Sequence, residues 1–332
     1  MKTYDFVAIG DVVTDEFISL QDAHVNCRID NTACELCMRF GDKIPYESLL
    51  TVYAAGNASN AAVSAARLGL NVAFVSNVGG DDLGQKMIDH LANESVDTSL
   101  IHVHEDKLSN HHFVLLYNVE RTILIKHEEY EYHLPSFAPP KWIYFSSVRG
   151  DSIPYHNEVA AYVHAHPETK LAFQPGIFEI NMGVEPLKDF YAASHVFFCN
   201  KEEAARILKI ETTNIRTLSE GIAALGPKIV CITDGPNGAY AYEAETGTIL
   251  KVPMFPDQNQ PADRTGAGDA FASTFTAMLA LGLSVEDALL AAPINSMSET
   301  QQIGSQTGLL SREKLEEYLK NAPANYTAEK VG

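Results

Sequence analysis

The chain has 332 residues, and its 24 basic and 43 acidic side chains give a formal net charge of −19. A hydrophobic content of 46% is sufficient for a large buried core and excludes an intrinsically disordered chain. The excess of acidic groups disfavours binding to nucleic acid or to anionic membranes, because both need a basic surface. A polyanionic ligand would need positive potential supplied locally, by backbone amides, a metal ion or a few basic side chains.

The beginning of the chain carries no basic segment that leads into an apolar one, so no secretion signal is expected. No apolar run approaches the about 20 residues that a membrane-spanning helix needs. Five cysteines in a chain of this length fit a reducing compartment better than a disulfide framework. These features predict a cytoplasmic protein.

Apolar runs typical of buried strands alternate with helical segments along most of the chain. The strand-like runs lie at residues 4–10, 71–77, 142–145, 171–173, 195–199 and 229–233. Residues 57–68 and 81–91 have the composition of helices, and the first of these is followed by Gly69. This alternation predicts an α/β fold, with a doubly wound and mainly parallel sheet flanked by helices.

Two segments, residues 17–46 and 101–133, interrupt the alternation. The second contains two strand-like runs on either side of a turn at residues 118–121. We expect the two insertions to form a small β-rich lid over the carboxyl edge of the sheet, where ligands bind in open α/β sheets. The α/β core would then comprise residues 1–16, 47–100 and 134–332. The alternative is that the insertions have no role in the site.

The strongest functional signal is the segment 263–271, DRTGAGDAF, which runs into a helical apolar pattern. Gly266, Ala267 and Gly268 fall at the start of this helix, where free amides and the helix dipole attract an anion. Asp269 follows in the first turn, and a carboxylate beside a phosphate site can accept a proton from an attacking hydroxyl. The alternative for Asp269 is a purely structural role in stabilising the helix.

Residues 263–271 resemble the C-terminal signature of the ribokinase-like carbohydrate kinases, which include sugar and nucleoside kinases. The resemblance implies that Asp269 is the catalytic base and that the amides of Gly266, Ala267 and Gly268 stabilise the transferring phosphoryl group. The fold that it implies is the same doubly wound sheet with a small β lid.

The segment 55–60 looks like the N-terminal signature of that family, G-G-N-x-x-N, with Ala55 in place of the first glycine. The resemblance implies that Gly56, Asn57 and Asn60 contact the hydroxyl groups of the substrate. Without it, Asn57 could simply cap a helix. Asp15 matches the family's aspartate after the first strand, which accepts hydrogen bonds from two sugar hydroxyls.

Further matches concern the nucleotide. Asn200 and Glu203 resemble the family's N-x-x-E motif, which implies that Asn200 lies near the phosphates and that Glu203 arranges Mg²⁺ through water. A capping box explains the same spacing. Three residues, Thr233, Gly235 and Gly238, resemble a turn that borders the nucleotide, and a looser match places Asn295 near adenine.

The resemblance as a whole implies an ATP-dependent kinase that uses Mg²⁺ and phosphorylates a sugar hydroxyl. A monovalent cation such as K⁺ near residues 266–268 and a homodimer formed through the lid are further family traits. Where family members that bind ribose have a glutamate, this chain reads Phe-Ser-Ser-Val at residues 145–148, so ribose itself is in doubt.

Three alternatives to a plain sugar kinase remain open at this point. A nucleoside kinase would stack the base on aromatic side chains, for which Phe17, Phe40, Phe113 and Tyr117 are the candidates. A phosphosugar kinase would need cations in the site, and these could be Arg121, Lys126 or Arg149, which otherwise read as surface charges. The third alternative is a sensor of sugars or nucleotides without catalysis.

Some residues of the insertions lie outside these motifs. His24, Cys27, Cys34 and Cys37 could form a tetrahedral zinc site or could be small core residues. The pairs at 111–112 (His-His) and 128–129 (Glu-Glu) carry no motif and are expected to be solvated residues of the lid.

Overall fold

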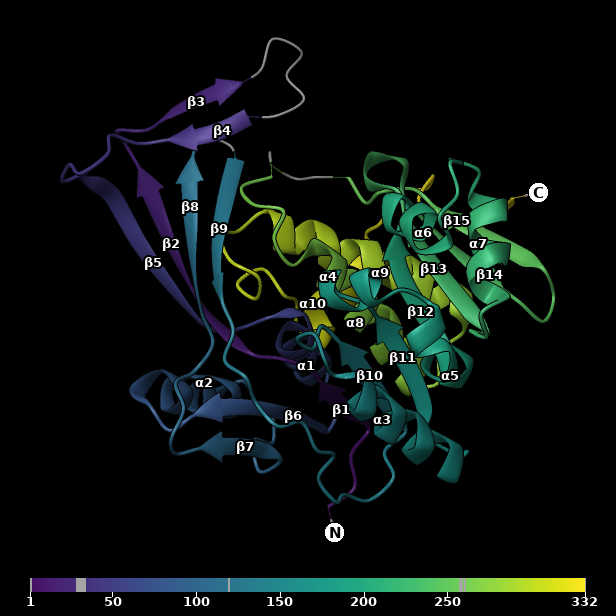
Figure 1. Ribbon diagram of the computed structural model, residues 1–332. Coiled ribbons are helices and arrows are strands. Elements are labelled where there is room, and N and C mark those ends of the chain that lie inside the picture. Colours follow the sequence, from purple (N-terminus) through teal and green to yellow (C-terminus); the bar gives the residue numbers. More distant parts are fainter. Residues whose placement is uncertain (1, 28–33, 119, 257–258, 260, 332) are drawn as a thin grey trace.

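A computed structural model describes residues 2–27, 34–118, 120–256, 259 and 261–331 (Figure 1). Its main sheet has ten strands in the order β16-β15-β14-β13-β12-β11-β10-β1-β6-β7. The pairs from β13 to β7 are parallel, and those from β13 to β16 are antiparallel. The strands of this sheet are β1 (Phe6–Ile9), β6 (Val72–Gly79), β7 (Ile101–His104), β10 (Trp142–Ser146), β11 (Lys170–Gln174), β12 (Ser194–Asn200), β13 (Ile229–Thr233), β14 (Ala239–Glu243), β15 (Thr248–Val252) and β16 (Glu329–Val331).

Helices cover both faces of this sheet. The strands alternate their side chains between two cores, so that Phe6 and Ala8 of β1 point into one and Val7 and Ile9 into the other. The first core is closed by α1 (Asn57–Arg67), α2 (Asp82–Asn93), α8 (Ala267–Ala280), α9 (Val285–Thr300) and α10 (Arg312–Lys320). The second is closed by α3 (Ile153–Ala165), α4 (Ile177–Met182), α5 (Lys188–Ala193), α6 (Lys201–Leu208) and α7 (Ile215–Ala223). The expected doubly wound α/β fold is confirmed.

A second sheet of four strands stands beside the core, on the left in Figure 1. Its order is β5-β2-β8-β9, and the hairpin β3–β4 lies at its far end. We call these two sheets the lid. The lid strands are β2 (Val13–Leu20), β3 (His24–Cys27), β4 (Cys34–Cys37), β5 (Tyr46–Ala55), β8 (His111–Tyr117) and β9 (Glu120–Lys126).

The boundaries of the lid differ from those expected at three places. Strand β2 already leaves the core at Val13, and the whole of β5 belongs to the lid, whereas residues 47–55 were assigned to the core. Conversely, β7 pairs with β6 in the main sheet, although residues 101–104 were assigned to the lid. The reason is that β5 pairs with β2 along its length and so cannot separate from it. The expected hairpin is formed by β8 and β9, and Val119 of its turn lies outside the described residues.

Candidate active site

The parallel strands bring several motif residues, and with them Gln174, to one edge of the main sheet. Gly10 follows β1, Gln174 ends β11, Asn200 ends β12 and Thr233 ends β13, and the last two are register partners. These are the carboxyl ends of the strands, where α/β sheets bind ligands.

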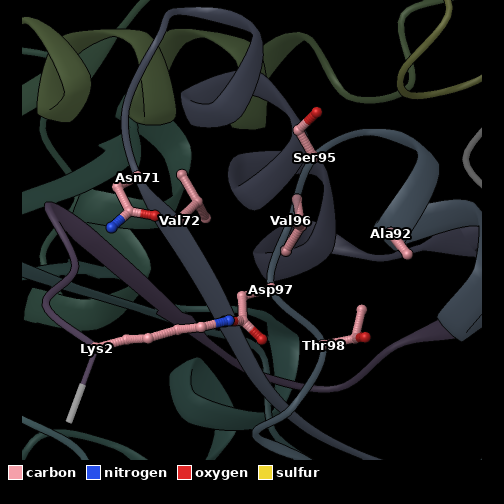
Figure 2. A pocket seen from close by; sticks show the side chains of 8 residues that line it. All are labelled: Lys2, Asn71, Val72, Ala92, Ser95, Val96, Asp97 and Thr98. Atoms are coloured by element: carbon pink, nitrogen blue, oxygen red, sulfur yellow. The ribbon is translucent and has the colours of Figure 1, made fainter.

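A pocket at the opposite edge of the sheet is shown in Figure 2. It contains an ion pair between Lys2 and Asp97, with 2.7 Å between Nζ and Oδ2. Asn71 and Val72 line the same pocket where β6 begins, so it lies at the amino ends of the strands. None of the motif residues lines this pocket.

Asp269 is the centre of the site. It lies in the first turn of α8 and is only 7% exposed. Its Oδ1 accepts hydrogen bonds from Asn57 Nδ2 at 3.0 Å and Gln174 Nε2 at 2.9 Å, and its Oδ2 accepts one from Asn60 Nδ2 at 2.8 Å. The two motifs thus meet at this carboxylate, although they are more than 200 residues apart.

Burial raises the pKa of Asp269 above the ordinary value of an aspartate, and the negative charge of Glu203 adds to the rise. The three amide donors oppose it, because they stabilise the charged form. A carboxylate that is more basic than usual, yet held in one orientation, is suited to accept a proton.

A second layer of polar groups holds these amides in place. Tyr144 donates its hydroxyl to Gln174 Oε1, which turns Nε2 toward Asp269. Asn60 Oδ1 accepts from Ser305 Oγ at 3.0 Å and Gln306 Nε2 at 2.9 Å, which turns Nδ2 toward Asp269. The sequence motifs did not identify Gln174, Ser305 or Gln306; a polar residue directly after the predicted strand 171–173 was the available signal for the first.

The residues before α8 form what we call the glycine turn, residues 263–268. Gly266 is the N-cap, with a left-handed backbone at φ 81°, and a Cβ there would lie 3.0 Å from atoms of Ser305. The first amides of a helix have no acceptor within the helix, so those of Ala267 and Gly268 are available to an anion. A Cβ at Gly268 would lie 3.8 Å from Gln174 Nε2, which leaves room on that side.

The turn before α1 has two residues with positive φ. Gly56 has φ 121°, and a Cβ there would come within 2.9 Å of the carbonyl oxygen of Asp11. The other left-handed residue of this turn is Ala54, at φ 54°, and Ala55 is not left-handed. Alanine in place of the first glycine of the motif therefore causes no backbone strain.

Asp15 lies on β2, close to two histidines of the lid. Its Oδ1 is 3.2 Å from His112 Nδ1, and His112 Nε2 is 3.0 Å from His127 Nε2. His127 Nδ1 lies 3.4 Å from Asp11 Oδ2, and Asp11 also accepts a hydrogen bond from Tyr132. Both histidine side chains are less than 15% exposed, so the expectation that the pair at 111–112 is solvated is wrong for His112. Its partner Asp15 lies about a hundred residues earlier in the chain, which hid the contact from the sequence.

The nucleotide motifs lie on adjacent strands. Asn200 Oδ1 accepts from the Glu203 amide at 2.8 Å, and Glu203 Oε2 accepts from the Asn200 amide at 2.9 Å. This is the capping box that the sequence left open, and it engages one oxygen of each side chain. Lys201 pairs with Asp234 and joins the start of α6 to the turn after Thr233.

In that turn Gly235 and Gly238 have positive φ, and a Cβ at Gly238 would overlap the carbonyl oxygen of Val252. The fold itself therefore requires Gly238.

Asn295, by contrast, is fully buried. Its amide donates to Thr274 Oγ1 at 2.8 Å and its Oδ1 accepts from the Leu310 amide at 2.8 Å, so its assignment to the adenine site is corrected to a structural role.

The cations considered for a phosphosugar are all paired with acidic groups. Lys126 pairs with Glu128, and Arg149 Nη2 lies 3.0 Å from Glu129 Oε1. Arg121 reaches Asp263 in the glycine turn.

Residues 145–148, where ribose-binding family members have a glutamate, contain no carboxylate. A glutamate from another element lies next to this segment: Glu179 of α4 is fully buried and accepts a hydrogen bond from the amide of Val148.

The cysteine cluster does not form a zinc site, which was one of the two alternatives left open by the sequence. Cys27 and Cys34 are opposite each other on β3 and β4 and are joined by a disulfide, while the residues between them lie outside the described part. Within the described ranges, no three His, Cys, Asp or Glu side chains are placed to share a metal ion. Both cysteines are exposed, so they are not core residues either.

Comparisons with known proteins identify the family of this chain. Residues 22–312 match the family described as pfkB family carbohydrate kinase. The ribokinase of Bacillus subtilis is 29% identical over 270 residues, which cover 80% of this chain and 87% of that protein. The fructokinase of Klebsiella pneumoniae is 27% identical over 80% of this chain and 91% of its own length. The chain belongs to the pfkB family of carbohydrate kinases, and it is a sugar kinase.

Solved structures share the fold. The ribokinase of Arabidopsis thaliana, in complex with ribose and ATP, superposes with a TM-score of 0.80 at 18% identity and covers 96% of this chain and 99% of that one. The nucleoside kinase of Methanocaldococcus jannaschii superposes with a TM-score of 0.77 at 18% identity and covers 97% of this chain and 99% of that one.

Among the described helices, none has the length and apolarity to cross a membrane.

Proposed function

We propose that this kinase transfers the γ-phosphate of ATP to a hydroxyl group of a sugar, with Asp269 as the base. The observation that carries the proposal is the buried Asp269 carboxylate, fixed by three amide donors beside the free amides of α8. A carboxylate offers about four lone-pair positions. Three are used, two on Oδ1 and one on Oδ2, so Oδ2 can accept the proton of the attacking hydroxyl.

The chemical step then follows. Asp269 takes the hydroxyl proton as the sugar oxygen attacks the γ-phosphorus, and the bond from that phosphorus to the β-phosphate oxygen breaks. The products are ADP and a sugar phosphate, and the proton leaves on Asp269. The amides of Gly266, Ala267 and Gly268 stabilise the charge on the transferring group; one such donor is worth roughly 10²–10³ in rate in other enzymes.

The acceptor site of the proposal lies between Asp269 and the lid. Asp15, Gly56, Asn57 and Asn60 would contact the sugar hydroxyls. His112 would keep Asp15 in position, because its Nδ1 lies 3.2 Å from Asp15 Oδ1.

The nucleotide site would be formed at the ends of β12 and β13. Its residues would be Asn200, Thr233, Gly235 and Gly238. Glu203 has an oxygen that the capping box does not use, so it fits a role in holding hydrated Mg²⁺. Bound there, Mg²⁺ would neutralise phosphate charge.

Two further family traits are part of the proposal. A K⁺ ion near the glycine turn would appear as a higher rate in potassium than in tetramethylammonium chloride. A homodimer through the lid is supported by exposed apolar side chains on its strands, and sedimentation would show twice the monomer mass. The main examples are Leu49, Leu50, Phe113, Ile123, Leu124 and Ile125.

The test is ADP release from MgATP with a panel of pentoses, hexoses, phosphosugars and nucleosides. Asp269→Asn should lower kcat by about 10²–10⁴-fold while ATP binding is kept. Asp82→Asn is the matched control, since Asp82 lies in the first turn of α2 and is exposed. Full turnover by Asp269→Asn would exclude the base. A nucleoside or phosphosugar as the preferred acceptor would replace the sugar, and ATP binding without turnover across the panel would favour a sensor.

A further inference from the structure

Arg121 connects the lid to the glycine turn. It lies on β9, an edge strand of the four-stranded lid sheet (Figure 1). Its Nη1 is 3.0 Å from Asp263 Oδ1 and donates to Thr265 Oγ1 at 2.7 Å. Both partners lie just before Gly266, so a lid side chain contacts the segment that carries the proposed anion site.

Asp263 joins several parts of the site. Its Oδ1 accepts from the amide of Thr265 at 2.9 Å, and its Oδ2 accepts from the amide of Gly304 at 3.3 Å. Gly304 also faces the lid, because a Cβ there would lie 3.4 Å from Val52 Cγ2 on β5. Arg121 thus binds a carboxylate that already ties the glycine turn to the loop around residue 304.

That loop continues to the catalytic carboxylate. Ser305 packs against Gly266 and donates to Asn60 Oδ1 at 3.0 Å, while Asn60 donates to Asp269 Oδ2 at 2.8 Å. A continuous series of contacts therefore runs from Arg121 through Asp263 to the base and to the first amides of α8.

We propose that Arg121 is a positioning residue, whose contact with Asp263 and Thr265 makes the shape of the glycine turn depend on closure of the lid. This inference rests on the proposed kinase function and adds to it. With the lid open, Asp263 loses the guanidinium, and the turn is no longer held from the lid side. Phosphoryl transfer is then efficient only when the acceptor site is covered and water is excluded.

The geometry separates this contact from an ordinary surface ion pair, which contributes little. The side chains of Arg121 and Asp263 are 40% and 12% exposed, and one guanidinium nitrogen serves two acceptors on the same turn. Arg39 provides the contrast: its partners Asp22 and Asp42 lie on the lid itself, and its side chain is 68% exposed. Opening the lid leaves the contacts of Arg39 intact and breaks those of Arg121.

The experiment compares Arg121→Ala with Arg39→Ala as the matched control. We expect Arg121→Ala to lower kcat by about tenfold or more. The KM for ATP should stay within about twofold, because the turn at residues 233–238 is not touched. Arg39→Ala should stay within about twofold of the parent in both. Asp263→Asn and the double variant complete a cycle, and the double variant should be no slower than the slower single variant.

A second readout does not depend on turnover. Hydrogen exchange of the amides at residues 263–268 and 303–306 should be faster in Arg121→Ala than in the parent and unchanged in Arg39→Ala. Unchanged exchange in Arg121→Ala would overturn the positioning role. Additive losses in the cycle would overturn it too, since they would indicate that Arg121 contacts the phosphoryl group directly. Absence of turnover in the parent with this exchange pattern intact would reject the kinase function and leave the contact established.

Discussion

The two glycines at positions 266 and 268 are required for different reasons. Gly266 has a left-handed backbone, and an added Cβ would crowd the backbone of Ser305 at 3.0 Å. Gly268 lies inside α8 with an ordinary backbone, and the nearest atom to an added Cβ is 3.8 Å away. The fold therefore needs the first glycine, whereas it does not require the second, which the proposed anion site would use to admit a phosphate.

Gly268→Ala should leave the protein as stable as the parent or slightly more stable, because alanine favours a helix by roughly 0.5–1 kcal/mol over glycine. We expect its kcat to fall at least about tenfold, since the methyl group obstructs the approach of the phosphoryl group to the amides. Gly266→Ala should instead lower the unfolding free energy by about 1–3 kcal/mol. Thermal melting and steady-state kinetics measure both, and a Gly268→Ala variant with the parent's kcat would contradict the anion site.

At the scale of single elements, the motif of Asn200 and Glu203 at the start of α6 has two explanations, a helix cap and a role in the site. The capping box uses Asn200 Oδ1 and Glu203 Oε2, and it is worth about 1 kcal/mol to the helix. The charge of Glu203 also acts on Asp269, whose pKa it helps to raise. The same glutamate can therefore serve the helix and the site.

Glu203→Gln separates these roles, because glutamine completes a capping box as well as glutamate does. We expect an unchanged melting temperature and an activation by Mg²⁺ that requires about tenfold more of the ion, since the carboxylate charge is lost. Titration of MgCl₂ at fixed ATP provides the measurement. If the titration curve matches that of the parent, Glu203 is a capping residue alone.

The elements also show what the sequence could predict. Fully buried strands such as β1 and β10 appear as apolar runs, and α1 and α2 were expected within a few residues of their observed ends. Strand β5 was missed as part of the lid, because its first five side chains are exposed and show no buried face.

In the site, the two motifs drew attention to Asp269, Asn57 and Asn60, and the structure joins these side chains by hydrogen bonds. The motifs could not place Gln174, His112 or Arg121, because their partners come from distant parts of the chain. Gln174 meets Asp269 through the packing of the core, and His112 meets Asp15 because β2 pairs with β8 in the lid. Only for Arg121 does the packing of the lid against the core make the contact.

At the scale of the whole molecule, buried titratable groups make stability depend on pH. Burial raises the pKa of Glu299 to about 8 and that of Glu179 to about 7, and nearby acidic groups add to both shifts. Burial lowers the pKa of His156 and of His195 to about 4. The histidines bind protons more readily when unfolded, so they stabilise the fold as the pH rises from about 4 to 6.5. The two glutamates bind protons more readily when folded, so they destabilise the fold as the pH rises above about 4.5.

Between pH 6.5 and 8 the two glutamates determine whether stability rises or falls with pH. The folded protein keeps the proton of Glu299 up to about pH 8, whereas in the unfolded chain this group is already ionised above about pH 4.5. Stability should therefore fall as the pH rises through this window, by about 2 kcal/mol for Glu299 alone. Glu299→Gln removes the ionisation and should flatten the slope, while Glu286→Gln, an exposed residue of the same helix, should leave it unchanged. Urea unfolding at pH 6.5 and 8 measures the difference; an equal slope in Glu299→Gln and the parent would show that Glu299 is not protonated in the folded protein.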